Sequence, residues 1–76
     1  MDPQDVGRRL QALRESRRPV RSRTGVSQLA GLHPDAVRRY ERGEQMPTAD
    51  ALVALAEYYG VTVDYILRGD EQKKNK

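Results

Sequence analysis

Four glycines divide the chain into short segments, and their spacing constrains the fold more than any other feature. Gly31, Gly43, Gly60 and Gly69 each follow a stretch in which apolar residues recur every three or four positions. This recurrence is typical of the buried face of an α-helix, and glycine readily adopts the left-handed conformation that ends a helix. No stretch has the alternation of a β-strand. In 76 residues, a length suited to one small domain, the spacing predicts an all-α fold of five short helices.

Capping residues and apolar positions predict where the helices lie. The first helix is expected over roughly residues 4–17, ahead of Pro19. Ser22, Thr48 and Thr62 are expected to cap the second, fourth and fifth helices with their hydroxyl groups. The core is expected to consist of Val6, Leu10, Leu13, Val26, Leu29, Ala30, Val37, Tyr40, Leu52, Leu55, Ala56, Tyr59, Val63, Ile66 and Leu67.

The third helix is expected to begin at Pro34 and to end at Gly43. Proline suits the first helical position because the N–H it lacks would have no partner there. Asp35 follows it, where the positive end of the helix dipole favours a carboxylate.

The second and third segments have the spacing of a helix-turn-helix. Counted from Arg23, the fifth residue is Ser27, which is small enough to let two helices cross closely, and the ninth is Gly31, which permits a sharp turn. The fourth, eighth, tenth, fifteenth and eighteenth residues are apolar, and they are Val26, Ala30, Leu32, Val37 and Tyr40. We therefore expect residues 23–40 to form this motif.

Charge is distributed unevenly along the chain. Ten arginines accompany three acidic residues between Val6 and Gly43, whereas one arginine accompanies six acidic residues between Glu44 and Gln72. Such a division is typical of a protein with one surface for a polyanion, although a charge-rich stretch can also be an ordinary solvated surface. We expect a folded domain over residues 1–69 and a flexible basic tail over residues 70–76.

The composition excludes several classes of function. The chain has no cysteine, so it forms no disulfide and no cysteine-ligated metal site. Its single histidine, His33, has no cluster of acidic residues beside it, and we interpret it as a helix cap or a neighbour of a phosphate. No apolar run approaches the roughly 18 residues of a membrane-spanning helix. Because no phosphate-binding loop or nucleophile elbow is present, we expect a non-enzymatic protein with no cofactor, no metal and no membrane partner.

The middle and end of the chain resemble a known family. Residues 31–43, Met46-Pro47-Thr48, Tyr59-Gly60-Val61 and residues 63–67 are similar to the Cro/lambda-repressor-like family of bacterial and phage regulators, also called the xenobiotic-response-element type. The resemblance covers residues 5–69. It implies a compact five-helix DNA-binding domain that acts as a homodimer.

The resemblance also implies roles for individual residues. The second and third helices would face DNA, with phosphate contacts from the start of the second helix and base contacts from the third. The implied DNA-binding residues, with His33 from our own interpretation above, are Ser22, Arg23, His33, Pro34, Asp35, Ala36, Arg38, Arg39 and Arg42. Arg14 and Glu41 match a structural pair that joins the first helix to the recognition helix in the family. Arg23 departs from the glutamine common at its position.

Sequence and resemblance together predict a transcriptional repressor that binds double-stranded DNA as a homodimer, in the cytoplasm and associated with the nucleoid. Its operator would be pseudo-palindromic, with Arg39 reading a guanine. The alternative is a protein-interaction module, such as the antitoxin of a toxin–antitoxin pair. Pro34 and Asp35 favour that alternative, because a proline offers no donor and a carboxylate repels phosphate. RNA binding is less favoured, since no exposed aromatic platform is expected.

Overall fold

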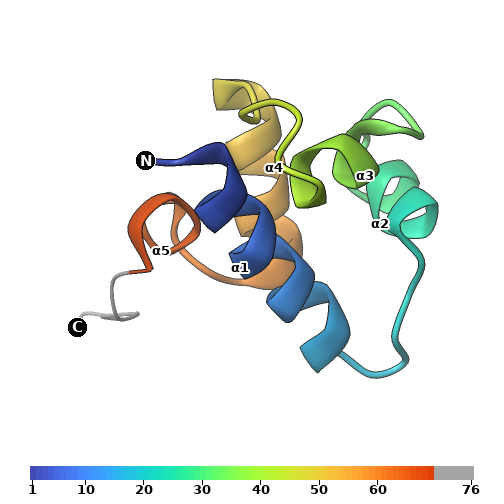
Figure 1. Ribbon diagram of the computed structural model, residues 1–76. Helices are drawn as coiled ribbons and strands as arrows, with labels where there is room; N and C mark the ends of the chain where they lie inside the picture. The colour runs from blue at the N-terminus through green and yellow to red at the C-terminus, as the bar shows by residue number, and fades with distance from the viewer. Residues whose placement is uncertain (70–76) are drawn as a thin grey trace.

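The computed structural model describes residues 1–69, which form five α-helices and no strand (Figure 1). The all-α prediction is therefore confirmed. The predicted flexible tail, residues 70–76, lies outside the described residues. The helices are α1 (Pro3–Ser16), α2 (Arg23–Leu29), α3 (Ala36–Glu41), α4 (Ala49–Tyr59) and α5 (Val63–Arg68).

The predicted helix caps are present. The hydroxyl groups of Ser22, Thr48 and Thr62 each accept the backbone N–H three residues later, at distances of 2.9, 3.1 and 2.9 Å. Gly60 and Gly69 end α4 and α5 in the left-handed conformation. All four segment-ending glycines have positive φ, between 71° and 77°. The local sequence therefore fixes most helix ends through side-chain oxygen atoms and glycine.

The first helix spans Pro3–Ser16, within one residue of its approximate prediction at each end, and Arg17 takes an extended conformation. The predicted start of the third helix is wrong, because this helix begins at Ala36 rather than Pro34. Residues 33–36 form a turn in which the Ala36 N–H donates to the His33 carbonyl at 2.9 Å. In the same turn the Asp35 N–H donates to His33 Nδ1 at 3.1 Å, so Pro34 lies in the turn and not in the helix.

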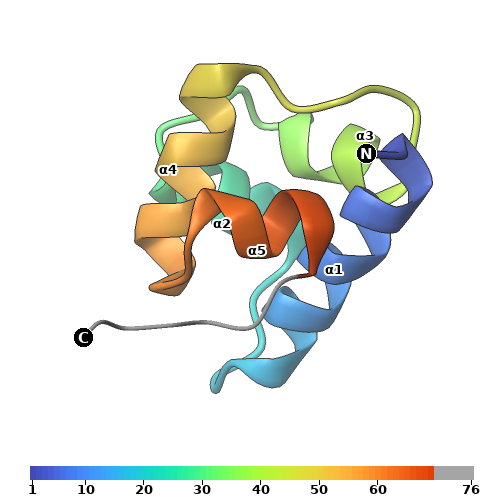
Figure 2. The same ribbon diagram turned by 90° about the vertical axis from the view of Figure 1, so that its left-hand side faces the viewer.

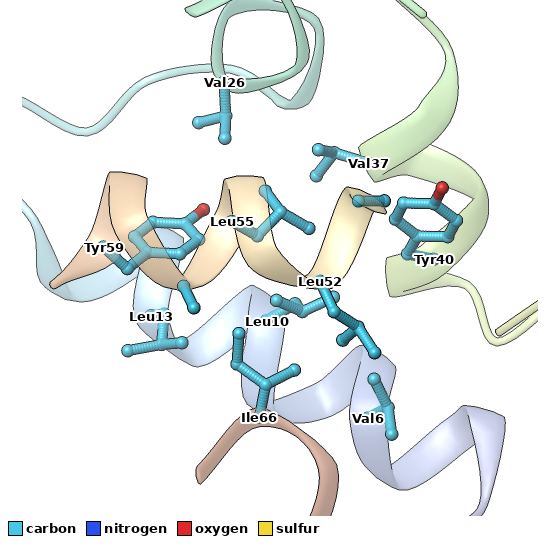
Figure 3. Close-up of a cluster of buried hydrophobic side chains, with 12 residues drawn as sticks. Val6, Leu10, Leu13, Val26, Val37, Tyr40, Leu52, Leu55, Tyr59 and Ile66 are labelled. Carbon is cyan, nitrogen blue, oxygen red and sulfur yellow. The ribbon is translucent and has the colours of Figure 1, made fainter. Parts of the chain in front are cut away.

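The core is one cluster to which all five helices contribute (Figure 3). Figure 3 shows Leu55 and Tyr59 of α4 between the side chains of α1 on one side and those of α2 and α3 on the other. The buried apolar side chains are Val6, Leu10, Leu13, Val26, Val37, Tyr40, Ala51, Leu52, Leu55, Ala56, Tyr59 and Ile66. Ala30, Val63 and Leu67 are half-buried against the cluster.

Leu29, which was expected in the core, is 58% exposed. The buried stripe of α2 runs through Val26, Ser27 and Ala30. Leu29 lies on the flank of this stripe, since each residue advances by about 100° around a helix. The prediction failed because α2 is too short to define its buried face by spacing alone.

The helices are arranged so that α2 and α3 form one end of the molecule. α1 packs against both α3 and α5, and α5 also contacts α4. Figure 1 shows α2 and α3 on the opposite side from α5, and in Figure 2 α5 lies in front with α2 and α3 behind it. No helix within residues 1–69 is long and apolar enough to cross a membrane.

Candidate nucleic-acid interface

A buried hydroxyl group joins the two helices of the helix-turn-helix. Ser27 is fully buried, and its Oγ accepts the N–H of Val37 at 3.0 Å while donating to the Arg23 carbonyl at 2.9 Å. The N–H groups of the first helical turn lack partners within their own helix, so α3 obtains one from α2. Ser27 was predicted to let the two helices cross closely because it is small. Its hydroxyl group also links the start of α3 directly to the middle of α2.

Gly7 lets α1 lie against the backbone of α3. A Cβ atom at this position would lie 2.8 Å from the carbonyl oxygen of Glu41 and closer still to that of Tyr40. Real Cβ atoms do not approach carbonyl oxygens so closely, so only glycine fits between the two backbones. This role of Gly7 was not predicted from the sequence. The available signal was a glycine beside buried Val6 in the middle of an amphipathic helix.

An ion pair makes a second connection between α1 and α3. Arg14 Nε and Nη2 donate to the two carboxylate oxygens of Glu41 at 2.8 and 2.9 Å. The side chains are 13% and 2% exposed, so both charges are largely removed from water. The hydrogen bonds that Arg14 donates to Glu41 raise the pKa of Arg14, which keeps the pair charged. Arg14 Nη1 also donates to the Arg21 carbonyl at 3.1 Å, which ties down the loop between α1 and α2.

The start of α3 carries a carboxylate shared by two arginines. Asp35 accepts hydrogen bonds from Arg38 Nε and Nη2 at 2.6 and 2.8 Å, and from Arg39 Nε at 3.0 Å. These bonds, chiefly those from Arg38, hold the pKa of the Asp35 carboxyl well below its usual range. Although Asp35 occupies the capping position of α3, its side chain makes no capping hydrogen bond.

The residues implied to bind DNA all lie at the start of α2, in the turn between the helices and along α3. The exposed residues among them are Ser22, Arg23, His33, Pro34, Arg39 and Arg42. Asp35, Ala36 and Arg38 are half-buried. The Ser22 hydroxyl accepts a capping bond but keeps its own hydrogen to donate, and Arg23 has no side-chain partner within residues 1–69. Arg42 pairs with Glu44 at 2.9 Å. The helix-turn-helix thus presents side-chain donors at the start of α2 and along α3, separated by Pro34, Asp35 and Ala36.

Several other arginines of the basic half have a different role. Arg9 Nε and Nη2 donate to the carbonyls of Ile66 and Leu67 at 2.8 and 2.7 Å, which satisfies the end of α5. Arg17 Nη2 donates to the carbonyl of Tyr59 at 2.6 Å, at the end of α4. These two guanidinium groups, like that of Arg14, hold the fold together. The basic surface is therefore smaller than the arginine count indicated.

The described residues contain no group of three or more histidine or acidic side chains that could hold a metal ion.

Comparison with known proteins gives two matches and one negative result. A family model described as a helix-turn-helix domain matches residues 5–66. The fold is similar to the P22 c2 repressor protein, solved in complex with synthetic operator 9T in the presence of Tl+, with 29% identity and a TM-score of 0.74. The alignment covers 86% of this chain and 96% of that one. No curated protein sequence matches significantly. The chain therefore belongs to the helix-turn-helix domain family, in its Cro/lambda-repressor-like branch of non-enzymatic DNA-binding regulators.

Proposed function

We propose that this protein is a sequence-specific transcriptional repressor that binds a pseudo-palindromic double-stranded operator as a homodimer. One observation carries the proposal. α3 is fixed to α2 by Ser27 and to α1 by the Arg14–Glu41 pair, and it presents the exposed side chain of Arg39. A helix held so firmly can enter a major groove without losing further conformational freedom. The similarity to the P22 c2 repressor bound to its operator supports this function.

Some donors of this interface would contact a base of the DNA, and others would contact its phosphates. Arg39 can place two N–H groups on O6 and N7 of a guanine, a contact that contributes about 1–3 kcal/mol of base discrimination. Ser22 and Arg23 lie at the start of α2, and Arg42 lies at the end of α3. These three side chains would bind phosphates on either side of the groove. In a dimer, two such helices would enter successive major grooves roughly 34 Å apart. Occupation of the operator would then exclude RNA polymerase.

Selection of binding sites from a random duplex library, at low and moderate salt, tests the proposal. We expect wild-type protein to recover a short inverted repeat with an invariant guanine in each half. Arg39→Ala should lose that guanine preference and weaken binding about 5- to 150-fold. Arg68→Ala is the matched control, because Arg68 is an exposed arginine on α5, at the opposite end of the molecule. Enrichment of no sequence, or an unchanged preference in Arg39→Ala, would contradict the proposal.

A second candidate function is binding of a partner protein, as in an antitoxin. One observation favours it: Leu29 is 58% exposed and lines a shallow hollow with Ala30, Ala54, Glu57 and Tyr58. Such a hollow beside an exposed leucine could receive a side chain of a partner protein. A toxin whose binding is lost in Leu29→Ser and retained in Arg39→Ala would identify this function.

A further inference from the structure

The side chain of Asp35 is arranged differently from an ordinary helix cap. A capping carboxylate accepts backbone N–H groups at the start of its own helix. The carboxylate of Asp35 instead accepts three side-chain N–H groups, two from Arg38 and one from Arg39. It is also the one acidic side chain among the nine residues implied to bind DNA. An anion at that position opposes phosphate binding, so its presence requires a compensating role.

We propose that Asp35 is a positioning residue that directs Arg39 toward a guanine and thereby sets the base specificity of the protein. The inference rests on the proposed DNA-binding function and deepens it. Asp35 holds Arg39 through Nε at 3.0 Å, and the two terminal nitrogens of Arg39 have no partner within residues 1–69. These terminal nitrogens carry parallel N–H groups with the spacing that guanine O6 and N7 require.

The same carboxylate holds the neighbouring arginine more tightly. Arg38 donates through both Nε and Nη2 to Asp35, whereas Arg39 donates through Nε alone, so both terminal nitrogens of Arg39 keep all their N–H groups for DNA. Arg38 is also half-buried, whereas Arg39 is exposed. Arg39 is therefore the better placed of the two arginines to read a base. Since a carboxylate offers about four acceptor sites and three are occupied, Asp35 retains little capacity to read a cytosine itself.

Holding Arg39 in advance reduces the conformational entropy lost when it binds. A free arginine side chain loses rotamer entropy when it binds, and an arginine already fixed at Nε loses less of it on contact with DNA. This smaller entropy loss strengthens binding only where a guanine is present, so it increases discrimination between guanine and the other bases. Because the charge of Asp35 repels every phosphate backbone, the residue lowers affinity for DNA of any sequence. The two effects have opposite signs, which makes the role measurable.

Asp35→Asn is the decisive variant, since it keeps the size of the side chain and replaces one good capping residue with another. For the wild-type protein, replacing the base pair that contains the selected guanine with another base pair should weaken binding about 5- to 150-fold. In Asp35→Asn we expect that penalty to fall to about threefold or less, while affinity for random duplex rises about threefold. Asp64→Asn, in the first turn of α5, removes the same charge at the opposite end of the molecule and should change neither quantity.

The outcomes separate the inference from the function on which it rests. If wild-type protein prefers a guanine and Asp35→Asn keeps the full penalty, Asp35 does not position Arg39 and the inference is overturned. If affinity for selected and random duplexes falls by the same factor, Asp35 has only a structural role. If wild-type protein shows no base preference, the proposed function itself fails. Asp35→Ser, another capping residue, repeats the test should thermal melting show that Asp35→Asn is unfolded.

Discussion

At the scale of single residues, Gly7 determines how closely the first helix can approach the recognition helix. In an isolated helix, replacing glycine with alanine would stabilise the structure by about 1 kcal/mol. Here the added methyl group would meet the carbonyl oxygens of Tyr40 and Glu41, and neither is a flexible side chain that can move aside. We expect Gly7→Ala to lower the free energy of unfolding by about 1–3 kcal/mol, because overpacking outweighs the gain in helix propensity. Urea denaturation measures the change.

Gly25→Ala is the matched control for this prediction. Gly25 also lies in a helix, but the nearest atom to an added Cβ would be the Ser22 side-chain oxygen, at 3.1 Å. The free energy of unfolding of Gly25→Ala should stay within about 1 kcal/mol of the wild-type value. Equal effects of the two substitutions would mean that the close crossing of α1 and α3 contributes nothing particular to stability.

At the scale of helices, the contact between α2 and α3 depends on the Ser27 hydroxyl. Ser27→Ala would leave the buried N–H of Val37 without an acceptor, which costs about 1–3 kcal/mol. We expect thermal unfolding at a lower temperature, and weaker DNA binding as α3 loses its fixed position. Ser16→Ala removes a hydroxyl that donates to the Leu13 carbonyl from an exposed residue, where water can replace it. A loss of stability in Ser16→Ala as large as that in Ser27→Ala would contradict this account.

The helices also show what the sequence could and could not predict. Ser22, Thr48 and Thr62 were correctly predicted as caps, because a cap depends on residues within one turn of it. The start of α3 was misplaced, since the turn before it depends on the His33 imidazole bonding to the N–H of Asp35. That contact competes with helical geometry at Pro34, and no periodic pattern reports it.

The candidate site could be predicted only in outline. Its location followed from the spacing of residues 23–40, and the Arg14–Glu41 pair followed from the family resemblance. The partners of Asp35 could not be predicted, because a carboxylate at that position can equally cap α3 or bind side chains. Likewise, the number of arginines in the sequence does not predict where their side chains point. Which of them face solvent depends on where α4 and α5 end.

At the scale of the whole molecule, only part of the positive charge is available to a polyanion. Arg23→Gln should weaken binding to all duplexes and reduce the slope of log affinity against log salt by about one, as expected when one phosphate contact is lost. Arg9→Gln removes the same formal charge but also two hydrogen bonds to the end of α5. We expect it to lower the melting temperature and to leave the salt slope unchanged. Fluorescence anisotropy across a salt series measures both slopes.

An equal decrease in the slope of log affinity against log salt for Arg23→Gln and Arg9→Gln would contradict this prediction. The protein would then bind DNA through its overall field rather than through the arginines at the start of α2. The described positions favour local contacts, because Arg9 reaches across to α5, away from the helix-turn-helix.

Some arginines stabilise the fold and others are available to bind DNA, and this difference limits how the protein can evolve. A lineage that needs a weaker or broader regulator cannot lose positive charge at random positions. Mutations at Arg9, Arg14 or Arg17 would remove a partner of a helix end or of Glu41, and selection against misfolding would eliminate them. Arg21 and Arg23 have no side-chain partner within residues 1–69, so the fold does not require them and their substitution would change DNA affinity without loss of structure. Regulatory strength can therefore diverge quickly at the start of α2 while the arginines that bond to helix ends and to Glu41 persist.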